Sequence, residues 1–212
     1  DLDNLEFAVD SLPALDVDRR FDVVYCVATL YFIADAERAV AELYDRVREG
    51  GHLVLNYPNR YSRAYFDREK PLRSDPGRPN RIYPDYETAK QRFVLSPPQS
   101  ASVPSLFDYM AYHSLKQVDG GWTWKFDSNV FNSDFGQRER MFRQGEIIAA
   151  TPGRKAIVYG QDSLLFDDDS AAYVRECGAA DVPIVGIPRA RHHLMLDEPI
   201  AFVSVLRTVL AQ

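Results

Sequence analysis

Residues 21–58 read FDVVYCVATLYFIADAERAVAELYDRVREGGHLVLNYP, and this stretch decides the fold. Its first ten residues are β-rich with little alternation, which predicts a parallel strand buried on both faces. A helix follows, because apolar residues recur at helical spacing at Ala36, Val40, Leu43 and Val47, and Gly50-Gly51 ends it. HLVLNYP, residues 52–58, predicts a second buried strand. The stretch therefore predicts one βαβ unit with a right-handed crossover.

The last third of the chain also alternates strands with helices. Strands are predicted over 155–160 and 182–188, and helices near 168–177 and over 198–210. The last helix is expected to turn four apolar residues inward, namely Phe202, Val205, Leu206 and Val209. This alternation is typical of a parallel sheet covered by helices.

The middle of the chain has a different pattern. Residues 59–80 are rich in Arg, Asp, Pro and Gly and predict a loop or linker. Helices are predicted to start within 83–93, over 103–115 and over about 136–149, and DGGWTWKFD (119–127) predicts a turn and an aromatic strand or extended arm. The fold class is therefore α/β, a mostly parallel sheet with flanking helices and a helical cap insertion. We expect one compact domain made of segments 1–66, a linker 67–80, the cap-like 81–150 and 151–212.

Composition limits the classes of partner. The net charge is −6 and the pI is near 5.2, and no basic stripe is present, so nucleic acid is not expected as a partner. We expect no membrane association, because no window approaches the length of an apolar span and no signal peptide is visible. The two cysteines, Cys26 and Cys177, lie far apart without metal-type spacing. We therefore expect a cytoplasmic protein with no metal site and no cofactor.

The segment RARHHLMLDEP, residues 189–199, is the strongest candidate for chemistry. A strand ends at Pro188, a loop presents His192, and a helix begins near Glu198. A base on a loop beyond the carboxyl end of a strand can reach a substrate in the crevice there. The alternative is a solvated loop histidine.

This segment resembles the C-terminal end of α/β-hydrolase family enzymes. His192, Leu196, Asp197 and Pro199 follow the order of a histidine, three residues, leucine, an acid, one residue and proline. The resemblance extends over about residues 80–212, because KAIVYGQDSLL looks like the preceding strand with its acid-bearing turn, and residues 83–99 with 119–127 look like the cap. It implies that His192 is the catalytic histidine, with His193 beside it.

The other members of the implied catalytic set are less well matched. Asp162 lies on the acid-bearing turn, one place earlier than the usual spacing, and the acidic run of Asp167, Asp168 and Asp169 is the alternative. No Gly-x-Ser-x-Gly elbow exists, and the serine position falls on Val27. Cys26, one residue away, is the candidate nucleophile, against the alternative of a buried and inert core cysteine.

About residues 11–60 resemble the middle of class I S-adenosylmethionine-dependent methyltransferases. The likeness lies in the FDVV strand, the helix with Ala-Glu-Leu, and the EGGHLVLNYPN segment. The family's glycine-rich cofactor loop lies upstream of these elements, and no glycine precedes Gly50 in this chain. The sequence thus joins parts of two doubly wound families, each without its Gly-rich turn.

Three functions follow from these patterns. The first is an α/β-hydrolase-like protein, incomplete as written, that cleaves an ester or acyl bond of a small apolar substrate. Trp122, Trp124 and His193 would line its substrate pocket, although aromatic core packing also explains the tryptophans. The alternatives are a methyltransferase-like partial domain and a non-catalytic or chimeric α/β scaffold. Open sheet edges would also favour a homo-oligomer.

Overall fold

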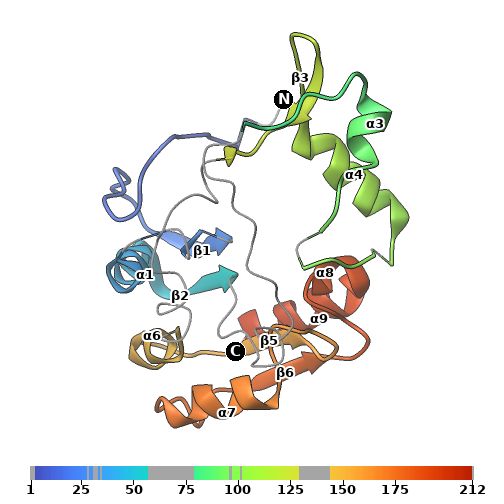
Figure 1. Ribbon diagram of the computed structural model, residues 1–212. Helices are drawn as coiled ribbons and strands as arrows, with labels where there is room; N and C mark the ends of the chain where they lie inside the picture. Colours follow the sequence, from blue (N-terminus) through green and yellow to red (C-terminus); the bar gives the residue numbers. More distant parts are fainter. Residues whose placement is uncertain are drawn as a thin grey trace.

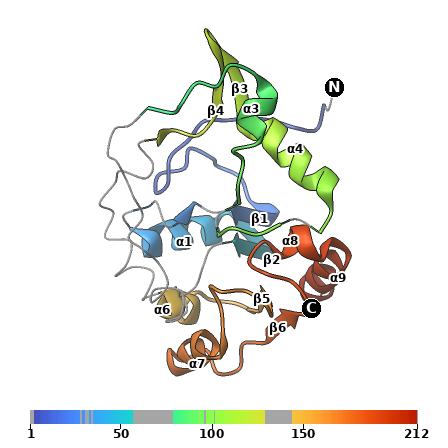
Figure 2. The ribbon, with the colours of Figure 1, turned by 45° about the vertical axis from the view of Figure 1, so that its right-hand side comes forward.

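The computed structural model describes residues 3–27, 29–30, 33, 35–56, 79–95, 97–100, 102–128 and 144–211. Residues 80–127, called the cap here, contain two helices and two strands. The cap separates two parts of the chain in which strands alternate with helices. The cap lies above the strands β1, β2, β5 and β6 (Figure 2). None of the helices in these residues has both the length and the apolar content that a membrane crossing requires.

The predicted βαβ unit is confirmed. Strand β1 (Phe21–Val27) pairs in parallel with β2 (Val47–Asn56), and α1 (Ala36–Asp45) connects them. Asp35 caps α1 by accepting a hydrogen bond from the backbone N–H of Arg38. The helix ends at Asp45, earlier than Gly50-Gly51, and these glycines lie inside β2. The helix therefore gives way to the strand within two residues.

The core of this unit lies between α1 and one face of the two strands. Ala39, Val40 and Leu43 of the helix pack with Cys26, Leu30 and Ile33, and with the inner faces of Val24, Leu53 and Leu55. The segment before β1 joins this core, because the Glu42 carboxylate accepts hydrogen bonds from the backbone N–H groups of Ala14 and Leu15, at 2.8 and 2.6 Å.

The prediction that β1 is buried on both faces is wrong. Val23, Tyr25 and Val27 point away from α1 and are 48%, 51% and 50% exposed. The absence of alternation in the sequence suggested two covered faces, but in the part of the chain that the structure describes the buried core of this unit lies on the α1 side of the strand pair. One face of β1 is therefore open.

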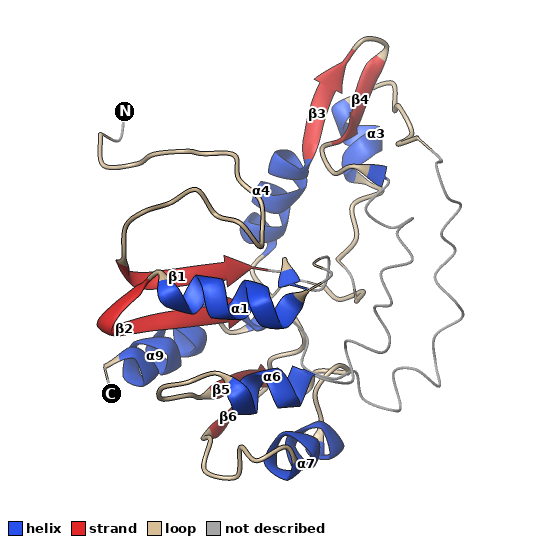
Figure 3. Ribbon diagram, turned by 90° about the vertical axis from the view of Figure 1, so that its left-hand side faces the viewer, coloured by secondary structure: helices blue, strands red, loops and turns tan. Residues whose placement is uncertain are grey.

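The C-terminal part also contains a parallel pair, as predicted. Strands β5 (Ile157–Gly160) and β6 (Ile184–Ile187) pair in parallel, connected by α7 (Asp168–Glu176). The short α8 (Leu194–Asp197) and then α9 (Pro199–Leu210) follow β6, and α6 (Gln144–Ala150) precedes β5. The pairs β1-β2 and β5-β6 form two separate two-stranded sheets within the described residues. Figure 1 shows α1 and α6 on one side of the strands and α9 on the other, and Figure 3 shows the same strands from the side of α1. The chain is thus an α/β protein.

The cap is not purely helical. It contains α3 (Tyr86–Lys90) and α4 (Pro104–Ser114), as predicted, and also an antiparallel hairpin of β3 (Leu115–Val118) and β4 (Gly121–Trp124). The helix predicted over 136–149 corresponds to α6 for residues 144–150, and its first part lies outside the described residues, as does most of the predicted linker. The residues predicted to face inward on α9 are half-buried, and none of its residues is fully buried.

Candidate active site

The histidine loop, residues 188–193, follows the carboxyl end of β6 as the sequence predicts. Arg189 adopts a left-handed conformation (φ 61°), and Ala190 behind it is fully buried. The turn after β5 lies against this loop, because the backbone N–H of Gln161 donates to Ile187 at 3.0 Å and that of Asp162 donates to Ala190 at 2.9 Å. The two loops that carry the predicted acid and base are therefore joined through their backbones.

Gly160 makes this close approach possible. A Cβ at this position would lie 2.3 Å from the carbonyl oxygens of Ala190 and Arg191. These are backbone atoms, so they cannot move aside without displacing the loop. Glycine at the end of β5 thus lets the acid-bearing turn lie directly against the histidine loop.

The His192 imidazole is half-buried rather than solvated. Its ring centroid lies 4.9 Å from that of His193 in an edge-on arrangement. Burial, together with the neighbouring His193, lowers the pKa of His192 from its ordinary 6.5 to about 4. The imidazole is therefore neutral at neutral pH and has a ring nitrogen free to accept a proton.

The structure brings the Asp162 backbone to the histidine loop but does not pair its side chain with the His192 ring. The Asp162 side chain is exposed, and burial and the neighbouring His193 account for the lowered pKa of His192. Asp167, the first of the alternative acids, caps α7 by accepting from the N–H and hydroxyl of Ser170 at 2.9 and 2.8 Å. That role is structural.

A buried ion pair holds the histidine loop, and the sequence interpretation missed it. Asp197, at the end of α8, has a side chain only 1% exposed. The Arg191 guanidinium donates to it through Nη2 at 2.7 Å and Nε at 3.0 Å, and the Arg191 backbone N–H adds a third bond at 2.9 Å. Burial raises the pKa of Asp197, but the hydrogen bonds from Arg191 outweigh it and lower that pKa overall. The ion pair thereby ties the histidine loop to α8.

Three residues of the segment leading into α4 complete this network. Gln99 and Ser102 donate to the Asp197 carboxylate at 3.2 and 3.3 Å, while Ser100 accepts from the Arg191 guanidinium. Gln99 also accepts from the His193 backbone N–H at 3.0 Å. The signal for Asp197 was available in the Leu-Asp-x-Pro motif, but nothing in SPPQSAS marks Gln99 as its partner.

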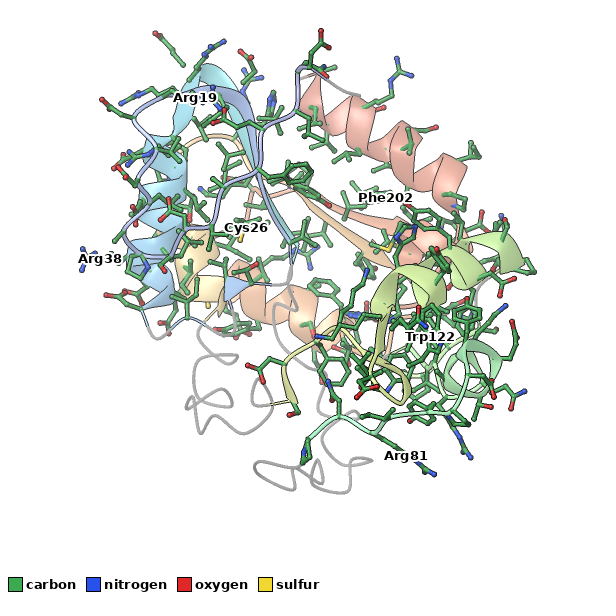
Figure 4. The ribbon with its side chains drawn as sticks, turned by 90° about the horizontal axis from the view of Figure 1, so that it is seen from above. Arg19, Cys26, Arg38, Arg81, Trp122 and Phe202 are labelled. Carbon is green, nitrogen blue, oxygen red and sulfur yellow. The ribbon has the colours of Figure 1, made fainter. Side chains whose placement is uncertain are left out.

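Cys26 lies in the core between α1 and β1 (Figure 4). Burial raises the pKa of its thiol, and contacts with Thr29 only partly oppose this. The side chain is therefore a neutral thiol at physiological pH. This environment favours the core cysteine over the nucleophile.

Trp122 and Trp124 belong to the core of the cap. Trp122 lies 5.3 Å from the Tyr86 ring, and Trp124 lies 6.2 Å from the Tyr83 ring, both edge-on. Trp122 also exchanges two backbone hydrogen bonds of 2.8 Å with Tyr83. Their placement corresponds to the aromatic-packing interpretation, within a cluster that includes Ala89 and Leu115.

Residues 3–20, which precede β1, contain no glycine and no described strand, so no glycine-rich turn for S-adenosylmethionine lies among them. The described residues also contain no group of three or more His, Cys, Asp or Glu placed to hold a metal ion.

Comparison with known proteins identifies both halves of the resemblance. A family model described as a methyltransferase domain matches residues 3–55. Among solved structures, the chain is similar to E-2-(acetamidomethylene)succinate hydrolase, with 17% identity and a TM-score of 0.60, over 90% of this chain and 66% of that one. No curated protein matches the chain.

Two further solved structures have the same fold. An esterase from M. tuberculosis shares 19% identity with a TM-score of 0.56, over 84% of this chain and 59% of that one. An α/β hydrolase from Novosphingobium aromaticivorans shares 17% identity with a TM-score of 0.52, over 91% of this chain and 66% of that one. The chain thus has an α/β-hydrolase-like fold and spans less than two thirds of the length of each of these structures.

Proposed function

We propose that this chain is a hydrolase-like protein in which His192 acts as a general base on a small apolar ester. The observation that carries the proposal is the half-buried, neutral imidazole at the carboxyl end of β6, on a loop held by Asp162, Arg191 and Asp197. A side chain in that state can accept a proton where α/β folds bind their ligands.

Water is the nucleophile in this proposal, because the Cys26 thiol is buried with a raised pKa and lies in the core under α1. His192 accepts a proton as the water oxygen attacks the ester carbonyl carbon. The imidazolium then returns the proton to the departing alkoxide, leaving an acid and an alcohol. No acyl-enzyme forms, so product release shows no burst.

The expected acceleration is small. A base with a pKa far below the working pH is always deprotonated but weakly basic, which places it near the lower end of the usual 10²- to 10⁴-fold, at about 10²-fold. Asp162 lies on the adjoining turn and is the group that would stabilise the imidazolium. We therefore expect Asp162→Asn to lower the rate less than loss of the imidazole does.

The test is steady-state hydrolysis of p-nitrophenyl acetate by the chain and by His192→Ala. His113→Ala is the matched control, because His113 is an exposed histidine on α4. We expect loss of the rate in His192→Ala, no change in His113→Ala or Cys26→Ala, and a rate that rises with pH through about 4 and is level above it. Equal rates for the chain and His192→Ala would remove the hydrolase proposal.

A non-catalytic α/β scaffold is the second candidate. It is favoured by the His192 ring, whose lowered pKa reflects burial and the neighbouring His193, with no acid of the described part of the chain bonded to it. This candidate predicts no hydrolysis above that of His192→Ala and no heat on calorimetry with S-adenosylmethionine.

We assign either form to the reducing cytoplasm, supported by Cys26 and Cys177, which are both free thiols.

A further inference from the structure

Five hydrogen bonds join the segment before α4 to the histidine loop and α8. They link residues 99, 100 and 102 to residues 191, 193 and 197, which lie more than 90 positions later in the chain. Figures 1 and 2 show this segment running along α8 on its way into α4. The cap and the site are therefore attached where the imidazoles lie.

Gln99 makes two of these hydrogen bonds, and its side-chain amide accepts in one and donates in the other. Its Oε1 accepts from the His193 backbone N–H at 3.0 Å, and its Nε2 donates to the buried Asp197 Oδ2 at 3.2 Å. The same Asp197 oxygen also accepts from the Nε of Arg191, the residue just before His192. Gln99 thus holds the His193 backbone directly and the Arg191 backbone only through Asp197.

We propose that Gln99 is a positioning residue through which the cap sets the burial of the His192 imidazole. The ring belongs to a loop that is held from β5 by Asp162 N–H, from α8 by Asp197 and from the cap by Gln99. Loss of the cap contact frees the backbone at His193, next to the ring. The loop then opens toward solvent on the side that the cap covers.

The direction of the effect follows from the groups that face the ring. Burial is the larger cause of the lowered pKa of His192, and the neighbouring His193 is the smaller one. The Asp197 charge is taken up by Arg191, and Asp162 is exposed on the adjoining turn. Hydration of the ring therefore raises the pKa of His192 from about 4 toward 6.5.

The experiment is an NMR titration of the imidazole Cε1–H signals in the chain and in Gln99→Met, which keeps the side-chain length and removes both polar atoms. Gln117→Met is the control, because Gln117 is exposed on β3. We expect the pKa of His192 to rise by about one pH unit or more in Gln99→Met, with His113 unchanged, and no change in Gln117→Met. The His193 amide should also lose its protection from hydrogen exchange.

Gln99→Asn keeps an amide that is too short to span both bonds, and it replaces Gln99→Met if that variant does not fold. An unchanged His192 titration with an equally protected His193 amide overturns the inference. The inference rests on the proposed function only for its catalytic consequence. A chain without esterase activity would refute the base role of His192, while the titration would still decide whether Gln99 positions the ring.

Discussion

Arg191→Met tests the ion pair that holds the histidine loop. Methionine keeps much of the aliphatic length of arginine but removes the two guanidinium bonds to Asp197, at 2.7 and 3.0 Å, while the bond from the residue 191 backbone N–H remains. The Asp197 side chain is 1% exposed, so its charge cannot turn to solvent for a replacement. The variant therefore leaves a carboxylate buried without its counter-charge.

The expected loss in the free energy of unfolding follows from the burial of Arg191 and Asp197. Removing one partner of a buried ion pair costs about 3–5 kcal/mol. The Arg191 side chain is 37% exposed, and Gln99 and Ser102 still donate to the carboxylate, so we expect about 2–3 kcal/mol near neutral pH. For a chain of this length that corresponds to a melting temperature about 5–10 °C lower.

The pKa of Asp197 predicts how the difference in stability between the parent chain and Arg191→Met changes with pH. In the parent chain the folded-state pKa of Asp197 is lowered, so its contribution to stability is present above the unfolded pKa and is lost as the pH falls through the folded value. In Arg191→Met burial dominates and raises that pKa above the unfolded value, so protonation at low pH relieves the cost. The difference in stability between the two chains should therefore shrink between about pH 7 and pH 4.

Urea unfolding at both pH values measures this difference. Arg48→Met is the matched control, because Arg48 pairs with Asp22 at 3.0 Å while both side chains are more than half exposed. We expect the control to lose less than about 1 kcal/mol, because exposed ion pairs contribute little. A loss below about 0.5 kcal/mol in Arg191→Met, or a difference that widens as the pH falls, would refute the reasoning.

Four further substitutions test other parts of the structure by the same unfolding assay. Gly160→Ala places a Cβ 2.3 Å from two carbonyl oxygens of the histidine loop, so it should cost about 2–3 kcal/mol and lower any rate that depends on His192; an unchanged midpoint would mean that the loops are not in contact. Asp167→Ala removes the N-cap of α7 and should cost about 1 kcal/mol, and a neutral result would contradict the capping bond. Val174→Ala, at a fully buried position, should cost about 2 kcal/mol, whereas Val27→Ala on the open face of β1 should cost less than about 1 kcal/mol; equal losses would contradict the one-sided burial of β1.

The sequence predicts the βαβ unit and the last βα elements well because local periodicity determines them. The apolar spacing of Ala36, Val40 and Leu43 leads to a helix against two parallel strands, and all three elements are present, although Val47, expected on the helix, is the first residue of β2. Local periodicity does not determine which faces of the strands are covered by other segments. Val23, Tyr25 and Val27 have the composition of a doubly buried strand, but whether a second layer lies on them depends on segments far away in the chain.

The candidate site shows the same division between local and distant information. A motif of eight residues predicts the histidine loop and places Asp197 four residues beyond the imidazole pair, because those positions are read along the chain. The partner that ties Asp197 to the cap is Gln99, 98 positions earlier, and its side chain acquires a role only after both segments have folded. No single-sequence pattern encodes such a pair, because an amide in a polar loop looks the same whether it faces solvent or a buried carboxylate.

No acid among the described residues is bonded to His192, and this has a physical consequence for the chemistry of the loop. A triad acid stabilises the imidazolium and keeps the pKa of the histidine near the working pH. The buried acid Asp197 on α8 is bonded to Arg191 instead, and the guanidinium neutralises the carboxylate charge. Asp197 therefore does not stabilise a charged His192 imidazole. The ring then experiences burial without compensation, and its pKa falls to about 4. The ion pair that fixes the position of the base thus also weakens it, and any chemistry at this site must proceed with an imidazole that is well placed but only slightly basic.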